Sequence, residues 1–317
     1  MTRVLMAVDA GKHTTKSFSM DAGRINKVSF RTKLTEITES NDLDLAGNSY
    51  RVIFKDKQYF VGDMGEDIDY STSKTNIIHQ LATYTAIAAL NGDEAAVQLV
   101  VGCPISIFKN KELKAEYKSM LMDNGAVHIG VNNKYIRFCF DNILVLPEGS
   151  GIVYNHVSFF KNKRVLVVDI GGRNINVAVY NNLVPEISSM QTSELGGFDL
   201  EKRLISQLNT QFGRNLTPND IQTVIKYNGL MINGEVNANS IEVVNSVYNS
   251  YINDVFKNLK VMGYDMSLME SVVFVGGTTQ MLKDTIKKYV NHAFITEDSQ
   301  WDNASGFLTA GEAKYNG

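Results

Sequence analysis

The stretch RVLVVDIGGRNINVAVY, residues 164–180, decides the fold that this sequence predicts. It begins as a β-branched apolar run that ends at Asp169, turns at Gly171 and Gly172, and alternates into a second strand over residues 174–180. The pattern predicts a β-hairpin with a carboxylate beside its turn. A turn without side chains lets backbone N–H groups approach an anion, and the carboxylate can hold a hydrated divalent cation. The hairpin therefore suits a metal–nucleotide phosphate group, although structural hairpins share the same pattern.

The same pattern occurs a second time, about half a chain length earlier. The segment RVLMAVDAGKHTTK near the N-terminus reads as strand and turn, and a further strand follows it. Asp9 then corresponds to Asp169, and Gly11 corresponds to Gly171. A repeat at this distance favours two duplicated lobes over a solenoid. Lys16 ends the turn and is either a point charge for a phosphate or a solvated hairpin lysine.

Length and composition are those of an ordinary globular protein. At a length of 317 residues, a single hydrophobic core usually divides into two. Hydrophobic residues make up 44% of the chain and charged residues 21%, and the sequence contains no low-complexity linker. The net charge of −3 gives no broad basic field, which excludes direct, sequence-independent nucleic-acid binding as the main activity. A DNA partner is therefore expected to act through an adaptor.

The cysteines and the N-terminal sequence indicate a cytoplasmic protein. Cys103 and Cys139 lie in apolar, strand-like surroundings without CxxC spacing, so we expect reduced core residues. No signal sequence precedes the first predicted strand, and no apolar run reaches the roughly 18 residues that span a bilayer. We expect no membrane association.

Between the hairpins the sequence predicts an inserted segment and several helices. Residues 26–72 are polar and β-rich, which indicates a small inserted subdomain with a hairpin at 50–63. Apolar residues at helical spacing predict helices at 73–91, 109–122 and 215–227.

Glu148 follows a proline-stiffened strand end in the segment LPEGSG. In open α/β sheets, ligands approach where a strand gives way to a helix, so Glu148 is placed to orient a water for attack on a phosphate. The alternative is a carboxylate at a helix N-terminus, favoured by the helix dipole.

Two further glycine pairs precede predicted helices. Gly196 and Gly197 come before an amphipathic helix, whose N-terminus is a possible anion site. Gly276 and Gly277 end a buried strand, and Thr278 begins the next helix. These glycines either let the flat ring of an adenosine lie against the backbone or allow close packing of helix and strand.

Six motifs follow one another in a consistent order: Asp9-Ala10-Gly11 with Lys16, Leu146-Pro147-Glu148, Asp169-Ile170-Gly171-Gly172, Leu195-Gly196-Gly197, Val275-Gly276-Gly277-Thr278 and Asn303-Ala304-Ser305-Gly306. Together they resemble the nucleotide-binding pattern of the actin, heat-shock chaperone and sugar-kinase superfamily. Within it, the chain is most similar to the ParM/StbA group of bacterial actin-like plasmid segregation proteins.

The resemblance implies an α/β, actin-like fold with two lobes of related ribonuclease-H-like topology and small inserted subdomains. Lobe I would comprise residues 1–155 and 304–317, with the insertion at about 26–72. Lobe II would comprise residues 156–303, with a helical insertion at about 201–267. ATP or GTP with Mg²⁺ would lie in the cleft between the lobes.

The resemblance also implies a function and partners. The chain would polymerise with itself when nucleotide binds, and hydrolysis would make the filament unstable. A DNA-bound adaptor of the ParR type would hold the filament ends and so segregate plasmid DNA.

Residue roles follow where positions match the pattern. Asp9 and Asp169 would hold Mg²⁺ through water, and Glu148 with Asp169 would be catalytic. The expected phosphate contacts are Gly11, Lys16, Gly171 and Gly172, and Lys12 and Arg173 are also expected to bind the nucleotide. The expected nucleoside contacts are Gly196, Gly197, Gly276, Gly277 and Thr278, with Glu201 and Lys202 as weaker candidates.

The chain departs from the pattern in both turns. Arg173, Asn174 and Asn176 stand where relatives usually have hydroxyl residues or an aspartate, and the first turn has Lys12 and His13 where small hydroxyl residues are common. Arg173 either donates to the γ-phosphate or faces solvent.

Three functions are compatible with this fold. The first is a filament-forming NTPase, and the second is a small-molecule kinase of the sugar-kinase type, although no sugar-kinase signature lies between the motifs. The third is a chaperone-like reactivase ATPase, which LGGFDLEKRL resembles, although the sequence ends directly after the ATPase lobes.

Overall fold

The computed structural model describes residues 2–21, 23–38, 43–91 and 94–315. Residues 39–42 of the expected insertion and the last two residues of lobe I lie outside this part of the chain. Contacts delimit two compact units: the first is Met1–Asn162 with Trp301–Gly317, and the second is Lys163–Gln300. Both combine strands and helices, as the predicted α/β class requires. The lobe boundaries suggested at residues 155 and 303 stay predictions.

The first unit is built on a nine-stranded mixed sheet in the order β3-β2-β1-β7-β9-β8-β5-β6-β4. Its central strands β1, β7 and β9 are parallel, so their carboxyl ends lie at one edge of the sheet. Asp9 is near the end of β1, and Glu148 directly follows β9. The strands are β1 (Thr2–Ala10), β2 (Thr14–Asp21), β3 (Arg24–Arg31), β4 (Leu34–Glu36), β5 (Ser49–Phe54), β6 (Lys57–Gly62), β7 (Ala95–Cys103), β8 (Val127–Val131) and β9 (Lys134–Pro147).

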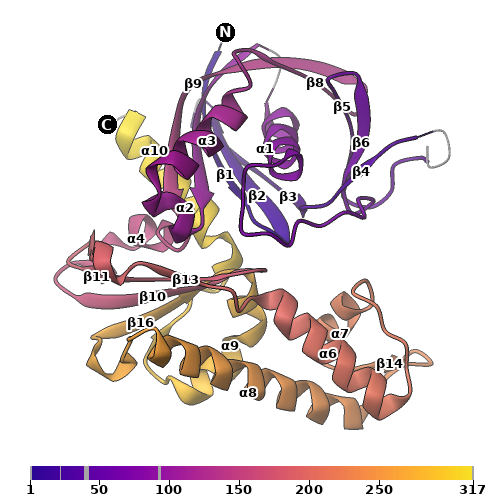
Figure 1. Cartoon of the computed structure of the whole chain (residues 1–317), viewed down its shortest axis with the longest axis vertical. Helices are drawn as coiled ribbons and strands as arrows, with labels where there is room; N and C mark the ends of the chain where they lie inside the picture. The colour runs from indigo at the N-terminus through magenta and orange to yellow at the C-terminus, as the bar shows by residue number, and fades with distance from the viewer. Residues whose placement is uncertain (1, 22, 39–42, 92–93, 316–317) are drawn as a thin grey trace. The chain divides into compact units, whose positions relative to one another are not determined.

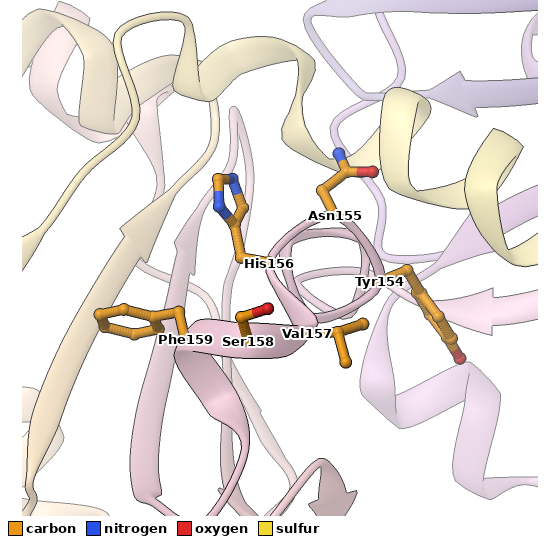
Figure 2. Close-up of a pocket in the computed structure, with 6 residues that line it drawn as sticks. All are labelled: Tyr154, Asn155, His156, Val157, Ser158 and Phe159. Carbon is orange, nitrogen blue, oxygen red and sulfur yellow. The ribbon is translucent and has the colours of Figure 1, made fainter.

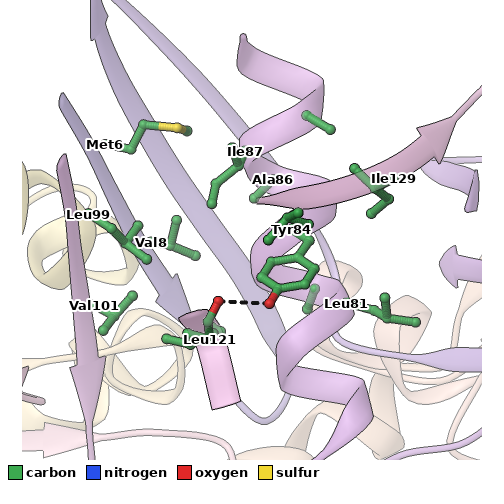
Figure 3. Packing of buried hydrophobic residues seen from close by; sticks show 14 of the residues in the cluster. Met6, Val8, Leu81, Tyr84, Ala86, Ile87, Leu99, Val101, Leu121 and Ile129 are labelled. Carbon is green, nitrogen blue, oxygen red and sulfur yellow. Dashed lines mark hydrogen bonds between the residues drawn. The ribbon is translucent and has the colours of Figure 1, made fainter. Parts of the chain in front are cut away.

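Helix α1 (Ile77–Leu90) lies inside the curve of this sheet (Figure 1) and contacts strands along much of it. It is buried on nearly all sides, and its Tyr84 hydroxyl donates to the carbonyl of Leu121 over 2.7 Å (Figure 3). The remaining helices of this unit are α2 (Ile105–Lys109), α3 (Lys111–Met122), α4 (Gly151–Asn155), α5 (Val157–Phe160) and α10 (Asp302–Tyr315).

Capping residues correct two predicted helix boundaries in this unit. The helix expected at 73–91 begins at Ile77, because the Asn76 side chain accepts the His79 backbone N–H as an N-cap. The helix expected at 109–122 begins at Lys111, because Asn110 caps it and separates it from α2.

The second unit contains the hairpin predicted at residues 164–180. Strands β10 (Arg164–Ile170) and β11 (Ile175–Asn181) pair antiparallel, with Ile170 opposite Ile175, which confirms the predicted hairpin. The sheet order is β12-β11-β10-β16-β17, and β13 also pairs with β11. Its other strands are β12 (Val184–Pro185), β13 (Gln191–Ser193), β16 (Ser271–Val275) and β17 (Ala293–Phe294), while β14 (Met231–Ile232) and β15 (Glu235–Val236) form a separate ribbon.

The helices of the second unit pack around this sheet and against one another. They are α6 (Gly197–Phe212), α7 (Ile221–Tyr227), α8 (Ala238–Val261) and α9 (Gly277–Tyr289); the 3₁₀ turns of the chain are η1 (Ile187–Ser189), η2 (Met266–Leu268) and η3 (Ser299–Trp301). The helix expected at 215–227 is wrong in its first part. Thr217 donates through both its backbone and its hydroxyl to Asp220, and this turn delays the helix until Ile221.

Candidate functional site

The first unit gathers buried charges at the carboxyl edge of its sheet. Asp9 and Lys16 lie opposite each other on β1 and β2, and each is 8% exposed. Burial raises the pKa of Asp9, Lys16 and Lys74 oppose that rise, and Glu148 adds to it. The burial of Lys16 is incompatible with a solvated hairpin lysine. Its contact to a phosphate stays a prediction.

Glu148 is held by a lysine that the sequence did not single out. The Lys74 ammonium lies 3.1 Å from Glu148 Oε1 and also donates to the carbonyl of Ala10. The Glu148 backbone N–H donates to the carbonyl of Cys103, which fixes the residue beyond the end of β9. Helix α4 begins only at Gly151, so this carboxylate faces Lys74 rather than capping a helix. No sequence pattern marks Lys74, because its importance comes from a contact between segments that are distant in the chain.

Lys12 is directed toward the segment that follows the inserted region. Its ammonium donates to Asp69 Oδ2 and to the carbonyl of Ser73. Burial and the charge of Lys74 lower the pKa of Lys12 to about 8, while Asp69 and Glu148 oppose that shift. The nucleotide-binding role expected of Lys12 stays a prediction, but this side chain already has a carboxylate and a carbonyl as partners.

The second unit brings three glycine-containing turns together beside Asp169. The Gly197 N–H and the Thr278 hydroxyl both donate to the carbonyl of Gly171, over 2.9 and 3.1 Å. Thus the first turns of α6 and α9 meet the turn of the β10–β11 hairpin.

Gly276 has the strictest requirement for glycine among these turns. Its φ of 100° is a conformation that side chains rarely adopt, and a Cβ there would lie 2.5 Å from Asp169 Oδ1. At Gly197, a Cβ would lie 2.4 Å from the Thr278 hydroxyl oxygen. Close approach of neighbouring residues therefore explains Gly276 and Gly197, whereas a Cβ at Gly277 would meet no described atom within 4 Å. A nucleoside contact for these glycines stays a prediction.

Arg173 is paired with an acidic residue of the neighbouring turn. Its guanidinium lies 2.9 Å from Glu194 Oε2 and donates to the Glu194 carbonyl over 3.2 Å. The side chain is 24% exposed, so Arg173 does not simply face solvent. Nearby, Asn174 is 4% exposed, and its side-chain oxygen has no hydrogen-bond partner within the described residues.

The remaining candidate site residues of the second unit are described by their burial alone. Asp169 is 3% exposed near the carboxyl end of β10. On α6, Glu201 is buried while Lys202 is exposed, and their roles stay predictions. Across the described ranges, no group of three or more His, Cys, Asp or Glu residues is arranged to hold a metal ion. Asp9 in the first unit and Asp169 in the second are each a single buried carboxylate, and one such group by itself suits an ion that keeps most of its water ligands.

A pocket of about 530 Å³ lies elsewhere on the first unit and is lined by residues of α4 and α5 (Figure 2). Figure 2 shows His156 and Phe159 pointing away from Tyr154, and burial lowers the pKa of His156. None of the expected nucleotide-binding residues lines this pocket. Within the part of the chain that the structure describes, no helix has both the length and the apolar character needed to cross a bilayer.

Comparisons with known proteins agree on one family. Residues 7–151 match the family model of actin-like protein N-terminal domains. The Alp12 filament structure is 33% identical, with a TM-score of 0.72, and the alignment covers 99% of this chain and 100% of Alp12. No curated protein sequence matches the chain.

Two more distant solved structures share the fold over their whole length. The archaeal actin homologue Ta0583 in complex with ADP is 14% identical with a TM-score of 0.80, covering 98% of this chain and 99% of that one. A 15-stranded ParM filament from Clostridium botulinum is 16% identical with a TM-score of 0.80, covering 99% and 100%.

Proposed function

Because the chain belongs to the family of actin-like proteins, we propose that it is a nucleotide-dependent, filament-forming NTPase that segregates plasmid DNA through a DNA-bound adaptor of the ParR type. The full-length similarity to Alp12, whose structure is that of a filament, carries the proposal. The similarity to a ParM filament supports the same reading at the level of the fold. The net charge of −3 supports an adaptor rather than direct contact with DNA.

The ligand of this proposal is ATP or GTP with Mg²⁺. A structural neighbour is in complex with ADP. The turns of Gly11, Gly171 and Gly172 would approach the phosphates, with the Gly171 N–H itself already donating to the carbonyl of Asn174 over 2.9 Å. Lys16 adds a buried positive charge. Asp9 and Asp169 would hold Mg²⁺ through water, and the ion would neutralise charge on the phosphates. The nucleoside would lie against Gly196, Gly197, Gly276, Gly277 and Thr278.

Hydrolysis would depend on Glu148. Its carboxylate would accept a hydrogen bond, and then the proton, from the attacking water, whose oxygen bonds to the terminal phosphorus as the bond to the leaving nucleoside diphosphate breaks. Asp169 would help to position that water. The burial of Asp9 and the ion pair of Glu148 with Lys74 support a preorganised charged site at this sheet edge.

The proposal is tested by sedimentation and phosphate release in parallel. At micromolar concentration the chain should pellet with Mg²⁺–ATP or Mg²⁺–GTP and should release phosphate, because bound nucleotide drives assembly and cleavage reverses it. Chelation of Mg²⁺ is the matched control and should abolish both signals. A chain that stays in the supernatant with both nucleotides contradicts the filament proposal, and a chain that pellets without releasing phosphate contradicts the hydrolysis proposal.

A further inference from the structure

Two buried lysines join the first hairpin turn to the segment Asp69–Asn76. Lys12 extends from the turn and donates to Asp69 and to the carbonyl of Ser73. Lys74 extends from the segment in the opposite direction and donates to the carbonyl of Ala10. Their side chains are 4% and 1% exposed, so both ammonium groups are committed to these contacts. We refer to the two reciprocal contacts as the lysine clasp.

The two halves of the clasp have different anionic partners. Lys12 is paired with Asp69, whose carboxylate is also fixed by the Ser71 N–H over 2.8 Å and by the Asn76 side-chain amide over 2.7 Å. Lys74 is instead paired with Glu148, which comes from the end of a different strand. Only the second half of the clasp therefore reaches the residue expected to orient water.

The position of Lys74 suits control over the Glu148 carboxylate. A buried ammonium needs a compensating anion, and a carboxylate with a 13% exposed side chain gains from a fixed cation. Because Lys74 also bonds Ala10 at the end of β1, it ties Glu148 to the strand that carries Asp9. The ends of β1 and β9 are thus joined through one ammonium group.

We propose that Lys74 is the positioning residue of the hydrolysis step, holding the Glu148 carboxylate in place for water, and that it does not itself drive nucleotide-dependent assembly. This inference rests on the proposed function. It adds a residue that the motif pattern does not contain and assigns the neighbouring Lys12–Asp69 pair the separate task of anchoring the segment.

The test compares Lys74→Met with Asp69→Asn in phosphate release at saturating nucleotide. Lys74→Met keeps most of the length of the side chain but removes its charge, and we expect a loss in kcat of about 10²-fold with KM and sedimentation retained. Asp69→Asn weakens the other half of the clasp, and we expect kcat within about threefold of wild type. Equal losses in the two variants would show that anchoring of the segment, rather than the Lys74–Glu148 pair, governs the rate.

A double-variant cycle separates positioning from a structural role. If Lys74 acts through Glu148, adding Lys74→Met to Glu148→Gln should cause no further loss in kcat. This double variant carries no unpaired buried charge from the pair, so the comparison remains available if Lys74→Met alone does not fold. A further loss of about tenfold or more in the double variant contradicts the proposal.

The same measurements distinguish the two proposals. If the wild-type chain releases no phosphate with either nucleotide, the proposed hydrolysis fails and the role of Lys74 fails with it. If the wild type is active and Lys74→Met matches it, only the role of Lys74 is wrong.

Discussion

The charged residues beneath the first hairpin turn are buried to a degree that their sequence does not reveal. Lys12, Lys16 and Lys74 are each less than a tenth exposed, and each lies near an acidic residue of the same unit. Burial of an ion is costly unless a partner compensates it, so this edge is stabilised by pairing and not by hydration. Its stability should therefore respond to the protonation of single residues.

Lys12 provides a pH-dependent prediction. Its pKa falls from 10.5 in the unfolded chain to about 8 in the folded one, first because of burial and then because of Lys74. Between these values the unfolded state binds more protons, so Lys12 makes the free energy of unfolding rise with pH by at most about 1.4 kcal/mol per pH unit. Below the folded pKa both states are protonated and this contribution to the slope disappears.

Urea denaturation of the wild type and of Lys12→Met, each at about pH 7 and about pH 9.5, measures this effect. The wild type should gain more stability over this interval than the variant. Other groups that titrate in the interval are common to both proteins, so they cancel in the comparison. Parallel pH profiles for the two proteins would contradict a depressed pKa for Lys12.

The sequence could predict which carboxylates end the strands, but it could not predict the lysine that pairs with Glu148. Asp9 and Asp169 follow apolar runs, and the structure places both near buried strand ends, as expected. Lys74 lies in a polar segment where solvated lysines are common. Its pairing with Glu148 depends on how the chain folds between them, which no local pattern encodes.

At the scale of elements, helix α1 links the sheet of the first unit to α3. The Tyr84 hydroxyl accepts from the Gln80 amide over 3.1 Å and donates to the Leu121 carbonyl over 2.7 Å near the end of α3 (Figure 3). The neighbouring Tyr117, on α3 itself, is equally buried, yet its hydroxyl has no hydrogen-bond partner in the described part of the chain. The two tyrosines are therefore suited to a comparison, because they are equally buried and differ in whether the hydroxyl group is hydrogen-bonded.

Removal of the hydroxyl should therefore change the free energy of unfolding differently at the two positions. Tyr84→Phe leaves the Leu121 carbonyl without this donor and should lower the free energy of unfolding by about 1–3 kcal/mol. Tyr117→Phe removes an oxygen that makes no such bond and should be neutral or slightly stabilising. Thermal unfolding of both variants measures the difference, and an equal loss of stability in the two would argue against this assignment of the hydrogen bond.

Elements were predicted well where periodicity is strong and less well at their ends. Both hairpins were recognised because apolar alternation and glycine turns are local signals. The helix starts at 73 and 109 were wrong because Asn76 and Asn110 cap the helices a few residues later. An asparagine signals either a cap or a loop, and only the surrounding fold decides which.

At the scale of the whole molecule, the resemblance and the actin-like fold are confirmed. Six motifs were enough to predict the fold, because their order along the chain constrains the topology more than any single motif does. The lobe boundaries stay predictions, because the order of motifs does not fix the residue at which one lobe ends. The site roles and the hydrolysis stay proposals, because motifs do not describe the surfaces that a nucleotide, a metal or a second copy would contact.

The link between hydrolysis and assembly gives a prediction for the whole polymer. Glu148→Ala should slow phosphate release by about 10²-fold or more, because it removes the group that we propose orients water. Assembly should persist, since under the proposed function polymerisation requires bound nucleotide and disassembly requires its cleavage. The variant should therefore pellet like the wild type at early times and stay in the pellet after the wild type has returned to the supernatant.

A time course of sedimentation with coupled phosphate detection tests this sequence of events. Glu112→Gln, an exposed carboxylate in the first turn of α3, is a matched control and should release phosphate at the wild-type rate. Undiminished release by Glu148→Ala would remove Glu148 from the mechanism. Slow release combined with normal disassembly would show instead that filament turnover is independent of cleavage, because the polymer would then shorten while its nucleotide remained intact.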